Sequence, residues 1–128
     1  MSRSAVHNAL GHEMSIALLL EDEALIALHV EQVLIDAGLE VSTVSTCADA
    51  LDWLKVHRPD VVIVDIILRD GPCHCVVARL VEDNIPFIVH SGDHPSMHAD
   101  TPFAYGTWIG KPVDGIEMVR AARRLVAA

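Results

Sequence analysis

The sequence predicts one α/β domain built on a doubly wound, five-stranded parallel sheet. Short apolar runs alternate with segments of helical period, the pattern of a parallel sheet covered by helices on both faces. The length of 128 residues suits a single domain. Hydrophobic residues make up 52% of the chain, which supplies a core and excludes a largely disordered protein.

The first half of the chain predicts two strands and two helices. The continuous apolar run IALLL at 16–20 is typical of a strand buried on both faces. Apolar residues at helical spacing follow it and stop at Gly38, a residue that is common just past a helix end. The segment 39–44 alternates as a strand does, and a second helix is expected to open at Thr46 or Asp49.

The second half repeats this pattern with one irregular connection. DVVIVD at 60–65 and PFIVH at 86–90 are apolar strands. Pro72 follows an RDG turn and is expected to be the first residue of the third helix. The segment 92–102 holds two prolines and little apolar period, so a short or irregular fourth helix is expected there. A short strand, TWIG at 107–110, and a last helix complete the order.

Composition and charge narrow the classes of partner. The chain has 18 acidic and 9 basic residues, a formal net charge of −9, which disfavours nucleic acid and favours a cation. No apolar run reaches the roughly 18 residues that cross a bilayer, so no membrane partner is expected. Three cysteines, an odd number, favour a cytoplasmic location over a disulfide framework. Residues 1–14 are expected to form a flexible leader before a domain at 15–128.

Polar side chains follow four of the predicted strands. They are Glu21 and Asp22 after the first strand, Asp65 after the third, Ser91 after the fourth and Lys111 after the fifth. Because the carboxyl ends of parallel strands meet at one edge of a sheet, these side chains should converge. Mg²⁺ prefers oxygen ligands, so we expect Asp22 and Asp65 to bind it directly and Glu21 through water. Lys111 and Ser91 would hold phosphoryl oxygens while a carboxylate acts as nucleophile.

The motifs around these residues resemble the response-regulator receiver domains of bacterial two-component signalling. The motifs are LLLEDE (18–23), DVVIVD (60–65), IVHSG (88–92) and GKP (110–112), in the order that the family shows. The resemblance covers about residues 15–128 and includes stand-alone, single-domain receivers. It implies a flavodoxin-like sheet with strand order 2-1-3-4-5.

The resemblance also implies a role for each candidate residue. Asp65 would accept a phosphoryl group from a histidine kinase or phosphotransfer protein with Mg²⁺, and a conformational change would signal to an unknown downstream protein. The chain would therefore not be an enzyme in the usual sense. The backbone carbonyl of Ile67 would be a further metal ligand, Ser91 the switch hydroxyl, and Lys111-Pro112 a cis peptide bond. Trp108 stands where the family has a smaller switch aromatic, so a switch role and a packing role are both open.

Two other functions compete with this interpretation. A Mg²⁺-dependent phosphohydrolase with an aspartate nucleophile commonly has a second aspartate two residues on, where this chain has Ile67, which cannot transfer protons. A flavodoxin-like ligand-binding module would need a loop that cradles phosphate after the first strand. The EDEA sequence at 21–24 would repel phosphate unless a metal were bound.

Two groups of potential metal ligands are expected to have ordinary structural roles. Cys73 and Cys75 lack a second cysteine pair to complete a zinc site. The histidines spaced by four residues are expected to lie on the surface or in loops, because Pro95 interrupts any helix that would align them; they are His90, His94 and His98.

Overall fold

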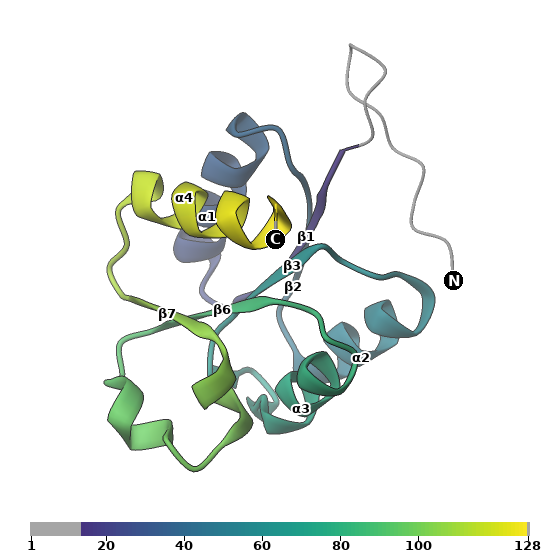
Figure 1. Ribbon diagram of the computed structural model, residues 1–128, viewed down its shortest axis with the longest axis vertical. Coiled ribbons are helices and arrows are strands. Elements are labelled where there is room, and N and C mark those ends of the chain that lie inside the picture. Colours follow the sequence, from purple (N-terminus) through teal and green to yellow (C-terminus); the bar gives the residue numbers. More distant parts are fainter. Residues whose placement is uncertain (1–13, 128) are drawn as a thin grey trace.

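The computed structural model describes residues 14–127 (Figure 1). The leader predicted at 1–14 lies outside these described residues except for Met14, so it stays a prediction. None of the helices within residues 14–127 is both long and apolar enough to span a membrane.

A five-stranded parallel sheet forms the centre of the domain. Its strands are β1 (Ile16–Leu20), β2 (Glu40–Val44), β3 (Val61–Val64), β6 (Phe87–Ser91) and β7 (Thr107–Gly110). They lie in the order β2-β1-β3-β6-β7, which confirms the predicted order 2-1-3-4-5. All residues of β1, β3 and β6 are buried, which explains why β1 and β3 are continuous apolar runs and why β6 begins as one before it reaches His90 and Ser91.

Helices cover both faces of the sheet (Figure 1). α1 (Ala24–Asp36) and α4 (Gly115–Ala127) cover one face, and α2 (Cys47–Val56) and α3 (His74–Glu82) cover the other. Successive residues of a strand point to opposite faces, so β1 contributes to two separate cores. Leu18 and Leu20 pack in the core under α2 and α3, and Leu19 packs in the core under α1 and α4.

The ends of α1 and α2 follow the signals in the sequence. Gly38 lies just beyond α1 with a φ of +95°, a conformation that glycine adopts without steric cost. Thr46 precedes α2, and its hydroxyl oxygen accepts the backbone N–H of Asp49 at 3.0 Å. Trp53 of α2 stacks on His57, with ring centroids 4.7 Å apart.

The connection after β3 differs from the prediction. Pro72 is not the first residue of a helix but lies in β5 (Gly71–Pro72), which pairs antiparallel with β4 (Ile67–Leu68). α3 begins two residues later, at His74. A proline suits either position, because both a first helical turn and an unpaired place in a hairpin do without its N–H.

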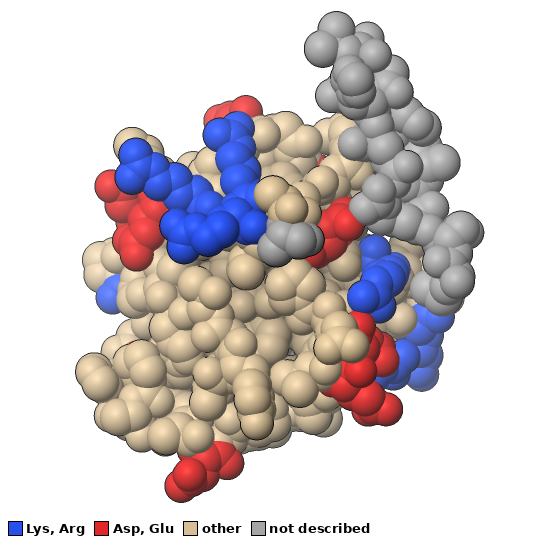
Figure 2. All heavy atoms as spheres, viewed as in Figure 1, with Lys and Arg blue, Asp and Glu red and all other residues tan. Residues whose placement is uncertain are grey.

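The segment before β7 is irregular, as predicted. It forms two short 3₁₀ helices, η1 (Pro95–His98) and η2 (Pro102–Tyr105), each of which begins with a proline. Phe103 is fully buried and anchors η2 in the core under α2 and α3. In the view of Figure 2 the surface over η1 and η2 carries few charges, whereas Lys and Arg gather over α4.

Candidate phosphoacceptor site

Three carboxylates meet at the carboxyl ends of β1 and β3. Carboxylate oxygens of Glu21, Asp22 and Asp65 all lie within 4.8 Å of one another. Within residues 14–127 no other group of three or more His, Cys, Asp or Glu side chains could share a metal ion in this way. Negative charges this close repel one another, so the arrangement favours a bound cation.

Lys111 supplies a positive charge from the loop after β7. Its ammonium donates to Glu21 Oε1 at 2.8 Å and to Asp65 Oδ2 at 3.0 Å. Burial alone would lower the pKa of Lys111, but the hydrogen bonds and charges of Glu21 and Asp65 outweigh burial and raise it. Lys111 is therefore protonated at neutral pH, and its bond to Pro112 is cis, as the family resemblance implied.

Both carboxylate oxygens of Glu21 accept hydrogen bonds from its neighbours. Its side chain is 2% exposed, its Oε1 accepts from Lys111, and its Oε2 accepts the backbone N–H of Glu23 at 3.2 Å. The sequence placed Glu21 at this edge of the sheet but gave no sign of its pairing with Lys111.

Asp65 is held from two sides. Its Oδ1 accepts the backbone N–H of Ile66 at 2.7 Å, and its Oδ2 accepts from Lys111. The side chain keeps 18% of its surface exposed, so the carboxylate is fixed in orientation and still reachable from solvent. Such a carboxylate is suited to nucleophilic attack on an incoming electrophile.

The β4–β5 hairpin leaves the carbonyl of Ile67 outside its own hydrogen-bond ladder. The backbone N–H of Cys73 donates to the carbonyl of Ile66 at 2.8 Å, which makes these two residues a hydrogen-bonded pair. In an antiparallel pair of strands, hydrogen-bonded and non-hydrogen-bonded pairs alternate. The next pair, Ile67 and Pro72, is therefore of the second kind, and the Ile67 carbonyl is available to another partner.

Ser91 ends β6 and is 5% exposed. Its hydroxyl oxygen accepts the backbone N–H of Asp93 at 3.0 Å, and its carbonyl accepts the backbone N–H of Lys111 at 3.0 Å. This backbone hydrogen bond fixes the position of Lys111 relative to Ser91. A hydroxyl also carries a donor, which leaves Ser91 able to bind a second group.

Trp108 packs inward against the core under α2 and α3. Its indole N–H donates to the carbonyl of Phe103 at 3.2 Å, and its ring stacks on His98 with centroids 5.8 Å apart. His98 Nε2 in turn lies 2.9 Å from Asp93 Oδ2. A chain of contacts therefore connects Ser91 through Asp93 and His98 to Trp108.

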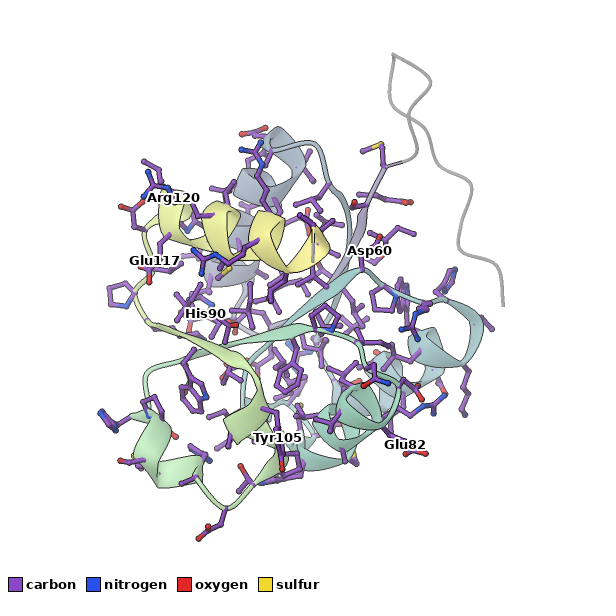
Figure 3. All side chains as sticks on the ribbon, in the orientation of Figure 1. Asp60, Glu82, His90, Tyr105, Glu117 and Arg120 are labelled. Carbon is purple, nitrogen blue, oxygen red and sulfur yellow. The ribbon has the colours of Figure 1, made fainter. Side chains whose placement is uncertain are left out.

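His90 corrects the prediction that it lies on the surface or in a loop. It lies within β6, is 2% exposed, and occupies the side of the sheet that α4 covers (Figure 3). Within residues 14–127 neither of its ring nitrogens has a hydrogen-bond partner. Burial, and next the charge of Lys111, lower the pKa of His90 to about 4, so the ring is neutral at pH 7.

The sequence matches the model of the response regulator receiver domain over residues 17–123. The chain belongs to this family. No match is found among curated proteins. This receiver domain is similar in structure to a response regulator receiver protein from Sinorhizobium medicae, with 31% sequence identity and a TM-score of 0.81, over 91% of this chain and 97% of the other.

Two further solved structures resemble this receiver domain in fold. One is the chemotaxis response regulator CheY4 of Vibrio cholerae, with 24% identity and a TM-score of 0.77, over 88% of this chain and 98% of that one. The other is the receiver domain of sensor histidine kinase PA1611 from Pseudomonas aeruginosa, with 18% identity and a TM-score of 0.80, over 90% of this chain and 99% of that one. That second structure has a magnesium ion coordinated in its active site cleft.

Proposed function

We propose that this receiver domain is the phosphoacceptor of a two-component phosphorelay. Asp65 takes a phosphoryl group from a histidine kinase or a phosphotransfer protein, and the product is a signalling conformation rather than a released metabolite. The observation that carries this proposal is the setting of Asp65, a half-buried carboxylate between two other carboxylates and the ammonium of Lys111.

The donor set at this site fits Mg²⁺. Mg²⁺ takes oxygen ligands, usually one or two carboxylates with waters and phosphate oxygens. The carboxylates of Asp22 and Asp65 and the free carbonyl of Ile67 would bind it, and Glu21 would contribute through water. When bound, the ion neutralises negative charge on the entering phosphoryl group.

The remaining steps belong to this chain's own residues. An Asp65 oxygen attacks the phosphorus of a phosphohistidine, the P–N bond breaks, and the imidazole leaves with the partner protein. Lys111, protonated because of its two carboxylate partners, binds one phosphoryl oxygen. Ser91 donates its hydroxyl to another oxygen. Phosphoryl transfer needs mainly this kind of positioning and charge neutralisation.

The downstream partner is proposed to bind over residues 92–106 and β7. Met97 and Tyr105 are exposed there by 67% and 78%, and Asp93 and Asp100 are the only residues of 92–106 that are Asp, Glu, Lys or Arg. The contacts from Ser91 to Trp108 connect this surface to the phosphorylation site. A cytoplasmic location, where kinase and receiver would meet, is part of the same proposal.

Intact mass spectrometry tests the proposal. The protein is incubated with acetyl phosphate and Mg²⁺, next to the variant Asp65→Asn. We expect one phosphoryl group on the unaltered protein and none on the variant. An unmodified wild-type protein, or equal labelling of the variant, would reject Asp65 as the acceptor. Steady release of inorganic phosphate at many turnovers per molecule would instead favour a phosphohydrolase.

A further inference from the structure

The hairpin that carries Ile67 is fastened to the start of α2 by a side chain. The carboxylate of Asp70 accepts the backbone N–H of Cys47 at 2.7 Å and that of Ala48 at 3.0 Å. These N–H groups belong to the first turn of α2, where a helix has no carbonyl of its own to offer them. These two hydrogen bonds lower the pKa of Asp70, and the one from Cys47 has the larger effect. The carboxylate is therefore charged at neutral pH.

Two further contacts join the same segments. The backbone N–H of Arg69 donates to the carbonyl of Ser45 at 3.4 Å, and the thiol of Cys47 donates to the carbonyl of Gly71 at 3.5 Å. Each residue of the turn at 69–71 therefore contacts the segment 45–48. The turn is held by the start of α2, a region far from it in sequence.

The cap of α2 is divided between a local and a distant residue. Thr46, the local residue, binds the N–H of Asp49 and has no hydrogen bond to the hairpin among those found in residues 14–127. Asp70, the distant residue, binds the two preceding N–H groups. Both side chains thus cap the start of the helix, but only Asp70 also holds the hairpin.

We propose that Asp70 is a positioning residue for the metal site. The inference rests on the proposed function, because the ligand that Asp70 positions is the backbone carbonyl of Ile67. β4 and β5 have two residues each, and so short a hairpin is not stable by itself. Asp70 supplies the external support that keeps the Ile67 carbonyl in one place. Groups that support metal ligands from behind commonly control metal affinity.

Titration with Mg²⁺ alone, followed by NMR, tests this inference in the full chain. The shifts of backbone amides near Asp22 and Asp65 give a dissociation constant for four proteins: the unaltered chain, Asp70→Ala, Asp70→Asn and Thr46→Ala. Thr46→Ala is the matched control, because it weakens the same helix end without touching the hairpin. Hydrogen exchange of residues 67–71 in metal-free protein provides a second measurement.

We expect Asp70→Ala to raise the dissociation constant for Mg²⁺ about tenfold, an effect typical of groups behind a metal ligand. The dissociation constant of Asp70→Asn should lie between those of the unaltered chain and Asp70→Ala, because a carboxamide has only one acceptor oxygen for the two N–H groups. Thr46→Ala should bind Mg²⁺ as the unaltered chain does. Exchange in the hairpin should be faster in Asp70→Ala even without metal, which a loss of negative charge alone would not cause.

Two results would overturn the positioning role. One is an unchanged Mg²⁺ affinity in Asp70→Ala, and the other is an equal loss in Thr46→Ala. A third result has a separate meaning: if the unaltered chain shows no Mg²⁺-dependent shifts, the metal site itself is wrong and the role of Asp70 with it.

Discussion

Replacing His90 by phenylalanine should make the protein more resistant to acid. The His90 ring is buried, and neither nitrogen has a hydrogen-bond partner within residues 14–127. The ionisable groups that affect its pKa are Lys111 and His29, which lower it, and Asp65, which raises it. Phenylalanine has a similar flat ring and fits an apolar setting without a proton to gain.

The magnitude follows from the depression of the pKa. The folded value is about 4 and the ordinary value is 6.5. Because the folded pKa is the lower one, the unfolded chain binds a proton first as the pH falls. Stability from His90 is therefore complete above about pH 6.5 and is lost progressively down to about pH 4. At about 1.4 kcal/mol per pKa unit the whole loss is about 3 to 4 kcal/mol.

Urea unfolding between pH 4 and pH 7.5 measures this difference. The free energy of unfolding of the unaltered protein should fall with acid more steeply than that of His90→Phe, and the two curves should diverge below pH 6.5. Val89→Ile serves as a control variant on the same strand that changes the packing and adds no titrating group. Parallel curves for the unaltered protein and His90→Phe would show that His90 is not kept neutral by burial.

Four more outcomes follow from the site. Lys111→Met should lower the Tm in metal-free buffer. Mg²⁺ should then raise the Tm of this variant more than that of the unaltered protein. An equal rise would show that the lysine does not compete with Mg²⁺ for the carboxylates. Asp22→Ala should abolish the rise in Tm with Mg²⁺, and an intact rise would remove Asp22 from the site. Ile67→Asn should lose phosphate from Asp65 faster than the unaltered protein in a phosphate-release assay, because an apolar side chain cannot align the attacking water. An equal or slower loss in the variant would contradict this role. Hydrogen exchange of residues 92–106 should slow after phosphorylation, and amides that already exchange as slowly as those of β3 in the unmodified protein would refute that switch.

Most of the sheet could be predicted because a strand that is buried on both faces appears in the sequence as a continuous apolar run. β1 and β3 are unbroken apolar runs and β6 begins as one, so the polar residues at the ends of these strands were expected to meet at one edge of the sheet. The structure brings Glu21 and Asp65 to Lys111 at that edge. The approach of carboxylate oxygens to within 4.8 Å agrees with what the strand ends predicted.

The remaining features depend on contacts between distant segments. Pro72 gives the same local signal at a helix start and in a hairpin, and the contacts of Asp70 with α2 decide between them. His90 was expected to lie on the surface or in a loop, because Pro95 interrupts any helix that would align it with His94 and His98, but β6 continues to Ser91 and buries the ring. The pairing of His98 with Asp93 depends on the path of an irregular loop, which no periodicity describes.

Both tryptophans stack on histidine rings, so the intrinsic fluorescence of the protein can report on changes around these rings. Trp53 lies on His57 in α2, and Trp108 lies on His98 beside the proposed partner surface. The emission of an indole depends on the groups in contact with its ring, so the fluorescence of each tryptophan should change when its histidine neighbour moves. In a Trp53→Phe variant all remaining emission comes from Trp108. Stopped-flow measurements on that variant would follow the arrival of a phosphoryl group in real time, without any attached dye.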